Sequence, residues 1–295
     1  MLTLQEKASV LIEALPYIQR FRGETVVVKF GGSSMEDPTV VDGILQDIAF
    51  MACVGMRPVV VHGGGKAINA ALRARGIAPN FLAGLRVTDE ATLDVVERVL
   101  NREVNPSLVK RLNALGCKAR ALYGEDILTA VRRTGTDPAT GETLDWGFVG
   151  DVTAADAEPA KAFLESGITP VITPFARDEA GQMYNINADA AAAALATAVH
   201  ARKLVFLSDV PGLLADPSDR SSLLSTLALS EVEKLIADGT IAGGMLPKIG
   251  GALKALASGV RKTHIVDAAL PHSLLLELFT DRGVGTEIVR QGDSK

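Results

Sequence analysis

Two glycine-rich turns, each directly after a hydrophobic segment, contain residue types suited to binding phosphate. Residues 26–30 precede the glycine pair 31–32, and residues 59–62 precede the glycine triplet 63–65. β-Branched runs of this kind are typical of buried strands. Glycines at a strand's exit let successive backbone N–H groups approach an anion without a Cβ in the way. With Lys29 at the first turn, the pattern indicates a phosphate held from two sides.

A second lysine and an aspartate extend this charge pattern. Lys248 follows another glycine pair at a predicted helix start, where a cation opposes the helix dipole unless an anion shares the site. Asp189 falls in the first turn of a predicted helix, which dipole stabilisation alone would explain, but it could also orient two lysines. For Lys29, the alternative is a strand-end lysine in solvent.

Three further positions are candidates for ligand binding. Arg86 precedes a predicted helix start and could form a forked contact with a carboxylate, although a solvated arginine is the alternative. Asn185 and Asn187 alternate on a strand end and could face one cleft, while Asn187 is also a plausible helix cap. Residues 208–212 follow a predicted strand, where open α/β sheets bind ligands.

Other catalytic patterns are absent from the sequence. The triplet 63–65 lacks both the Walker A ending and the dinucleotide-binding spacing, and no GxSxG motif occurs. The 4 histidines show no metal spacing, and His62 is expected to pack or hydrogen-bond. With 2 cysteines, neither a disulfide framework nor a cysteine zinc site is expected. No metal site is predicted.

Composition indicates a cytoplasmic globular protein. The chain has 295 residues, of which 47% are hydrophobic and 22% charged, with a net charge of −5. Aromatic residues make up 4%, and no basic cluster is interleaved with them, so a nucleic-acid partner is not expected. Charges at Glu6, Lys7 and Glu13 exclude a signal peptide, and no apolar run is long enough to span a membrane.

The elements that must position these residues alternate between strand and helix. Strands are predicted at 25–30, 58–62, 118–122, 169–173, 203–207 and 263–266. Helices are predicted at 38–54, 66–75, 89–101, 105–115, 157–166, 188–200, 229–237 and 248–258. This alternation predicts an α/β sandwich with a mainly parallel sheet.

Two segments lie outside this alternation. Residues 128–150 contain turn dipeptides between short polar stretches and predict a hairpin. Residues 1–22 have apolar positions at helical spacing and predict an amphipathic helix that Pro16 kinks or ends. Packing of its apolar face on its own domain or on another subunit is equally consistent with the sequence.

At this point the chain resembles the amino acid kinase family over nearly its whole length. The resemblance rests on VVVKFGG, VVVHGGG, GLRVTD, GFVGDVT, NINADAAAAALA, LSDVPGLL, GGMLPKI and GVGTEIV, in this order. The GLRVT and NxNAD segments favour members that act on N-acetyl-L-glutamate over those that act on carbamate, uridylate or aspartate.

The resemblance implies a three-layer α/β/α sandwich over residues 23–295, with an acyl-amino-acid lobe at about 23–178 and a nucleotide lobe at about 179–295. It implies ATP-dependent phosphorylation of the side-chain carboxylate to give N-acetyl-L-glutamyl 5-phosphate, the second step of arginine biosynthesis. A carboxylate is already a nucleophile, so no general base is needed. Mg²⁺ would arrive with ATP, held by phosphates and water.

The resemblance also implies roles for individual residues. Those that would stabilise or orient the transferring phosphoryl group are Lys29, Lys248, Asp189, Gly32 and Gly64. Those that would hold N-acetyl-L-glutamate are Gly64, Gly65, Arg86 and Asn185. Those that would meet ATP are Asp209, Val210, Pro211, Gly212, Leu213, Leu214, Thr240, Ile241, Ala242 and Lys248.

The N-terminal helix resembles that of the arginine-inhibited branch, whose helices interlace to join dimers into a homohexamer (a trimer of dimers). The arginine-site positions carried over are Tyr17, His264, Glu277 and Gly283. Three places depart from the family pattern. Lys66 stands where proline is usual, residues 122–126 replace a glycine–serine–glycine–lysine loop, and Leu213 and Leu214 stand where that branch often has a lysine.

Two other functions fit the same features. The first is a kinase for a related acyl-amino acid such as N-acetyl-aminoadipate, which the N-terminal helix disfavours. The second is a non-catalytic amino-acid sensor on the same fold. A sensor has no need of Lys29, Lys248 and Asp189, so their joint presence favours the enzyme.

Overall fold

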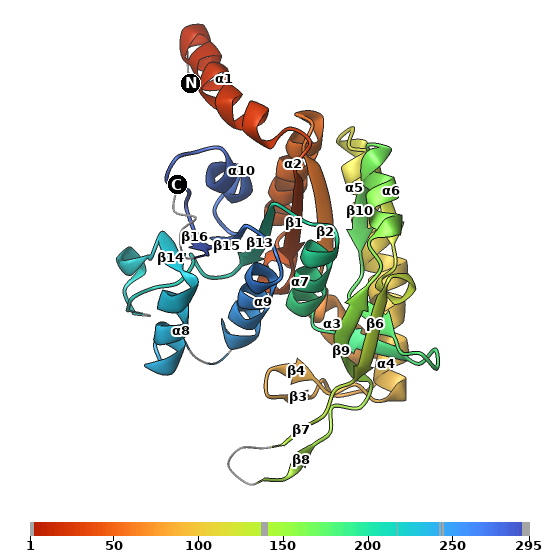
Figure 1. The fold of residues 1–295 in the computed structure, drawn as a ribbon. Coiled ribbons are helices and arrows are strands. Elements are labelled where there is room, and N and C mark those ends of the chain that lie inside the picture. The colour runs from red at the N-terminus through yellow and green to blue at the C-terminus, as the bar shows by residue number, and fades with distance from the viewer. Residues whose placement is uncertain (1–2, 137–140, 217, 242, 244, 291–295) are drawn as a thin grey trace.

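The structure is a computed structural model that describes residues 3–136, 141–216, 218–241, 243 and 245–290. At its centre is an eight-stranded sheet (Figure 1). Its strands, in spatial order, are β14 (Thr226–Ala228), β16 (Thr286–Val289), β15 (Lys262–Asp267), β13 (Lys203–Ser208), β1 (Thr25–Phe30), β2 (Arg57–His62), β10 (Thr169–Ile172) and β5 (Ala119–Leu122). Neighbouring strands run parallel, except that β16 is antiparallel to β15. The predicted mainly parallel sheet is therefore confirmed.

Helices cover both faces of the sheet because its strands bury alternate residues on opposite sides. Val27 belongs to one apolar core and its neighbours Val26 and Val28 to the other. The first core includes residues of α6 (Glu158–Glu165), α7 (Ala188–Ala198), α8 (Leu229–Ala237) and α9 (Met245–Ala257). The second includes residues of α2 (Pro38–Cys53), α5 (Asn105–Ala114) and α10 (Ser273–Leu278). The result is a three-layer α/β/α sandwich.

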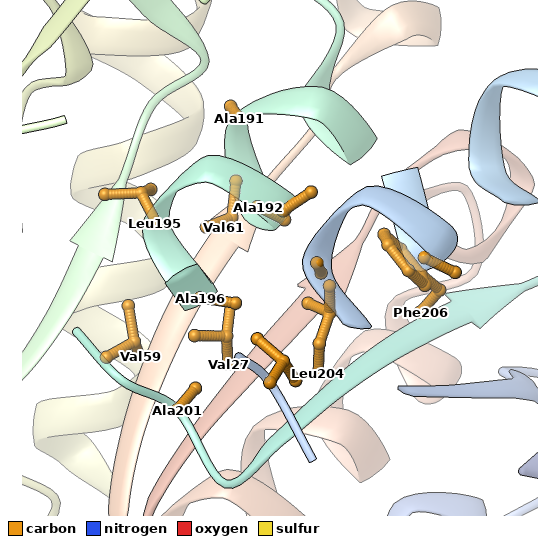
Figure 2. Close-up of a cluster of buried hydrophobic side chains, with 14 of the residues drawn as sticks. Val27, Val59, Val61, Ala191, Ala192, Leu195, Ala196, Ala201, Leu204 and Phe206 are labelled. Atoms are coloured by element: carbon orange, nitrogen blue, oxygen red, sulfur yellow. The ribbon is translucent and has the colours of Figure 1, made fainter. Parts of the chain in front are cut away.

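The alanine-rich helix α7 lies close against the sheet. Figure 2 shows Ala192 and Ala196 in one buried cluster with Val27, Val59 and Leu204. Small side chains reduce the distance between helix and strands. The first turn of α7 is thereby held beside the ends of β1 and β13.

Smaller elements surround the end of the sheet where its parallel strands terminate. The strands β6 (Leu128–Arg132), β9 (Val149–Ala155), β11 (Phe175–Arg177) and β12 (Met183–Ile186) form a closed barrel. Two hairpins extend from this region: β3 (Phe81–Leu82) with β4 (Leu85–Arg86), and β7 (Gly135–Thr136) with β8 (Thr143–Leu144). The helices α3 (Gly65–Ala74) and α4 (Glu90–Val99) form a third apolar cluster together with a π-helical turn (Leu100–Val104). The predicted hairpin excursion is present as β6–β9, and its tip at 137–140 lies outside the described residues.

The N-terminal helix α1 (Leu4–Phe21) projects from the rest of the molecule (Figure 1). It continues through Pro16 and does not end there, because Tyr17 and Phe21 pack on Phe279 beyond the proline. Its earlier apolar side chains remain exposed, with Leu11 at 69% and Ile12 at 68%. In the described part of the chain, no helix combines the length and apolar character needed to cross a membrane.

Candidate functional site

The two glycine turns lie side by side where β1 and β2 end. Phe30 pairs with His62 in the strand register, and the Gly63 N–H donates to Phe30 O at 2.9 Å. A Cβ on Gly31 would lie 3.1 Å from both Cα and N of Gly63. The two backbones therefore pack directly on each other, which glycine alone allows without displacement.

Two lysines and one aspartate meet beside these turns. Lys29 Nζ lies 2.8 Å from Asp189 Oδ1, and Lys248 Nζ lies 3.1 Å from Asp189 Oδ2. All three residues are buried, with relative exposures of 8–9%. Two ammonium groups on one carboxylate leave one net positive charge, suited to a partner rich in anionic oxygens.

Each of these three groups is fixed by its own element. Lys29 extends from β1, while Asp189 lies in the first turn of α7, where Asn187 accepts from the N–H groups of Asp189 and Ala190. Asn187 is thus the helix cap. Lys248 lies in the first turn of α9, and its Nζ lies 5.3 Å from the centre of the Phe206 ring. The group therefore joins a strand and two helices that are far apart in sequence.

Burial and charge act against each other in this group. Burial is the largest influence on Asp189 and alone would raise its pKa, but Lys29 and Lys248 together hold that pKa below its ordinary value. Burial lowers the pKa of Lys248, and Asp189 offsets part of this effect. At neutral pH the arrangement is a compact ion triad.

Gly64 is enclosed on its side-chain face. It caps α3 without a side-chain hydrogen bond, and a Cβ there would clash with Leu100 Cδ2 on the π-helical turn. Such turns within helices are frequent at functional sites. The Gly64 N–H, at the positive end of α3, is positioned by packing from Leu100.

His62 has a structural environment. It is fully buried, its Nδ1 lies 2.8 Å from Gly63 O, and its Nε2 lies 3.1 Å from Asn105 Nδ2. Burial lowers its pKa to about 4, so the ring is neutral at pH 7. The prediction that it packs and hydrogen-bonds is confirmed.

Arg86 lies in the hairpin strand β4 and reaches the start of α3. Its Nη2 donates to Asn69 Oδ1 at 2.6 Å and to Gly65 O at 3.3 Å, and its guanidinium lies 4.7 Å from the Phe81 ring centre. The side chain is buried, burial lowers its pKa, and its Nη1 has no hydrogen-bond partner among the described residues. A buried, unsatisfied cation of this kind suits an anionic ligand.

Asn185 is joined to the Arg86 strand through Thr88. Its Nδ2 donates to Thr88 Oγ1 at 3.2 Å, and Thr88 Oγ1 donates to Arg86 O at 2.9 Å. Sequence reasoning considered neither Thr88 nor Asn69 as part of the site. The contacts of Asn69 with Arg86 and of Asn185 with Thr88 join positions far apart along the chain, so the GLRVTD motif that contains Thr88 does not by itself reveal them.

The segment expected to meet ATP follows β13. Gly212 has a φ of +149°, and a Cβ there would lie 2.5 Å from Thr286 Oγ1, which accepts from the Leu213 N–H at 2.8 Å. Asp209 begins this segment and tends to raise the pKa of Lys248, as a nearby negative charge does. Leu213 is buried. The remaining members of the predicted set are Val210, Pro211 and Leu214 on the same segment, Thr240 and Ile241 after α8, and Ala242, which lies outside the described residues.

The four positions expected to form an arginine site gather at a second place. His264 Nδ1 lies 2.6 Å from Glu277 Oε1, and Glu277 Oε2 accepts from the Val284 and Gly285 N–H groups at 2.7 and 2.9 Å. A Cβ on Gly283 would lie 2.5 Å from Glu277 Oε2.

A cavity of about 610 Å³ lies at this second place. Tyr17, Glu277 and Gly283 line it, and the Tyr17 hydroxyl donates to Asp281 at 2.7 Å. Its wall also includes Lys203, whose Nζ lies 3.1 Å from His264 Nε2 and whose pKa burial lowers to about 8. Sequence reasoning missed Lys203, although a lysine at the start of an apolar strand was a usable signal.

The departures from the family pattern also have structural environments. Lys66 is exposed and pairs with Glu36, on the segment after the first glycine turn. Glu125 accepts from Asn101 Nδ2 at 2.6 Å, and burial raises its pKa. Lys66 therefore links the two turns through an exposed ion pair, which contributes little to stability.

Comparisons with known proteins identify the family. The Amino acid kinase family profile matches residues 24–267. A protein of Symbiobacterium thermophilum named acetylglutamate kinase is 49% identical over 287 residues, covering 97% of this chain and 98% of that protein. A Synechocystis protein of the same name is 49% identical over 286 residues, covering 97% of this chain and 94% of that protein.

Among solved structures, N-acetylglutamate synthase from Neisseria gonorrhoeae, complexed with coenzyme A and L-arginine, matches with a TM-score of 0.80 and 27% identity. The match covers 96% of this chain but 65% of that one, so the chain spans about two thirds of the synthase's length.

Proposed function

The chain belongs to the amino acid kinase family, and from this premise we propose that it transfers a phosphoryl group from ATP directly to the side-chain carboxylate of N-acetyl-L-glutamate. Lys29, Lys248 and Asp189 would stabilise and orient that group during the transfer. The chain's activity is that of an acetylglutamate kinase, a phosphotransferase of arginine biosynthesis. The product would be N-acetyl-L-glutamyl 5-phosphate. The observation that carries the proposal is the pair of buried ammonium groups on one carboxylate beside two touching glycine turns.

In this proposal the site residues align the phosphoryl group and neutralise the negative charge on its oxygens. Phosphoryl transfer depends on alignment and on stabilising the equatorial oxygens. Lys29 and the N–H groups of Gly32 and Gly64 would meet the phosphoryl group from the acceptor side, and Lys248 from the nucleotide side. Asp189 keeps the ammonium groups from moving apart. Both of its oxygens face lysines, so Mg²⁺ would be held by the phosphates of ATP and by water.

Binding of the acceptor would use the acyl-amino-acid lobe, residues 23–178, together with Asn185. Arg86 has an unpaired nitrogen to offer a carboxylate, and Gly64 and Gly65 offer N–H groups at the start of α3. The nucleotide would lie over residues 209–214 and 240–242 of the second lobe, residues 179–295. A cytoplasmic location is part of the proposal.

The test is a hydroxylamine trap. The chain is incubated with ATP, Mg²⁺ and one acid at a time, and acyl phosphate is read as hydroxamate. N-acetyl-L-glutamate should give the strongest signal. A stronger signal from N-acetyl-aminoadipate would refute the substrate assignment, and no signal from any acid would favour a sensor.

Regulation by arginine is a separate part of the proposal. The cavity combines the carboxylate of Glu277, partly exposed backbone at Gly283 and several cations, a set of groups that suits a zwitterionic guanidinium ligand. The structure of the related Neisseria synthase, solved in complex with coenzyme A and L-arginine, supports arginine as the ligand. Millimolar arginine should lower the rate, and Glu277→Gln should raise the concentration needed by at least tenfold. An unchanged wild-type rate would refute inhibition.

Assembly into a homohexamer, as a trimer of dimers, would use α1. Its exposed side chains Leu4, Leu11, Ile12 and Leu15 recur at helical spacing and form an apolar face that is not covered within the described chain. A second copy of the same helix has a matching face. Covering such a face by association is favourable, since the apolar surface leaves water.

A further inference from the structure

Trp146 holds the hairpin that carries Arg86. It is the chain's single tryptophan, is 3% exposed, and its Nε1–H donates to Leu82 O at 2.9 Å. Leu82 lies on β3, which pairs with β4 so that Phe81 is opposite Arg86. The indole N–H therefore contacts the strand beside the one that carries the arginine.

The backbone around Trp146 holds the other end of the hairpin. The Thr88 N–H donates to Trp146 O at 2.9 Å, and the Phe148 N–H donates to Thr88 O at 2.6 Å. Thr88 also receives the Asn185 hydrogen bond. The segment 146–148 thus contacts the hairpin before and after Arg86.

The indole itself has little freedom to move. A Cβ on Gly135 would lie 2.9 Å from Trp146 Cη2, and the Arg133 guanidinium lies 5.1 Å from the ring centre. Arg133 is in turn paired with Asp151 at 2.5 Å. Residues at the base of the β7–β8 extension therefore contact the ring in addition to the hairpin.

The hairpin has little support of its own. Its strands have two residues each, and Phe81 is 52% exposed. An isolated two-stranded hairpin is marginally stable in water. We propose that Trp146 is a positioning residue for the acyl-amino-acid site, acting through Leu82 and Thr88 to hold Arg86 for a substrate carboxylate. This inference rests on the proposed function.

The test compares Trp146→Phe with the wild type. The variant keeps an aromatic ring and loses the N–H donor, so a hydrogen bond of ordinary strength is removed from the hairpin. KM for N-acetyl-L-glutamate should rise about three- to tenfold, while KM for ATP stays unchanged. Asn113→Ala is the matched control, since it removes side-chain hydrogen bonds to Val109 O on α5 and Ala119 O on β5. It should lower the melting temperature without changing either KM.

A second variant and a spectroscopic signal complete the test. Gly135→Ala would push the ring and should raise the same KM even if Trp146→Phe fails to fold. In the wild type, N-acetyl-L-glutamate should change the emission of the single tryptophan, and ATP alone should not. An active wild type whose KM is unchanged in both variants overturns the inference and leaves the function intact. An inactive wild type overturns both.

Discussion

Gly64→Ala tests whether the second glycine turn is positioned by the π-helical turn. The added Cβ would meet Leu100 Cδ2 well inside the roughly 3.5 Å of a relaxed carbon contact, so one partner must move by about 1 Å. Leu100 is 1% exposed and Val104 Cγ2 lies 3.8 Å from the new atom, so the turn itself is expected to shift. A displacement of about 1 Å at a reacting centre lowers turnover by about 10²-fold.

The assay is the hydroxamate rate at saturating ATP and N-acetyl-L-glutamate, with the melting temperature measured in parallel. Gly43→Ala is the control, because a Cβ there meets nothing within 4 Å and lies inside α2. Adding Leu100→Ala to Gly64→Ala removes the clash and should recover at least tenfold of the lost turnover, despite the cavity cost of about 2–5 kcal/mol for the second change. Turnover within threefold of wild type in Gly64→Ala alone, or no recovery in the double variant, would refute the reasoning.

Three further predictions follow from the same contacts. Asp189→Asn leaves two buried ammonium groups without a counter-charge. The free energy of unfolding in urea should fall by about 3–5 kcal/mol, and turnover should fall about 10²-fold. A variant as stable as the wild type would contradict the triad. Because burial lowers the pKa of Lys248, turnover should fall as the pH rises, and the fall should begin below pH 10.5, the ordinary pKa of lysine. Lys248→Arg stays charged and should move the fall in turnover to higher pH. The pKa of Lys248 is lower in the folded than in the unfolded chain, so its contribution to stability rises as the pH rises between these two pKa values. Unfolding that accompanies the loss of activity would therefore count against titration of Lys248 as its cause. Deleting residues 1–15 removes the exposed apolar face of α1, so light scattering should report dimers in place of the proposed hexamer. An unchanged mass would exclude α1 as the contact.

The central strands could be predicted from the sequence because their side chains suit a pleated, buried surface. Residues 25–30 and 229–237 were predicted with the bounds that β1 and α8 have in the structure. The strands β14 and β16 and the helix α10 were missed, since they span only three to six residues. Residues 89–101 and 105–115 were predicted as two separate helices, and the structure joins them through the π-helical turn.

Some parts of the site could likewise be predicted from the sequence, and others could not. Lys29, Lys248 and Asp189 could be proposed because glycine pairs and helix starts mark them locally. Packing of Leu100 on Gly64 and the hydrogen bond from Trp146 to Leu82 could not be predicted, because each depends on how distant elements meet. Residue types therefore indicated the charges, while the parts that hold them in place became visible only in the fold.

Turnover of Lys248→Ala, measured together with its affinity for ATP, tests the central claim most directly. Lys248 is held against Asp189 at 3.1 Å and is proposed to act on the transferring phosphoryl group more than on the bound nucleotide. Turnover should therefore fall by at least about 10²-fold while ATP affinity changes by less than about threefold. A near-normal rate with N-acetyl-L-glutamate would contradict the account.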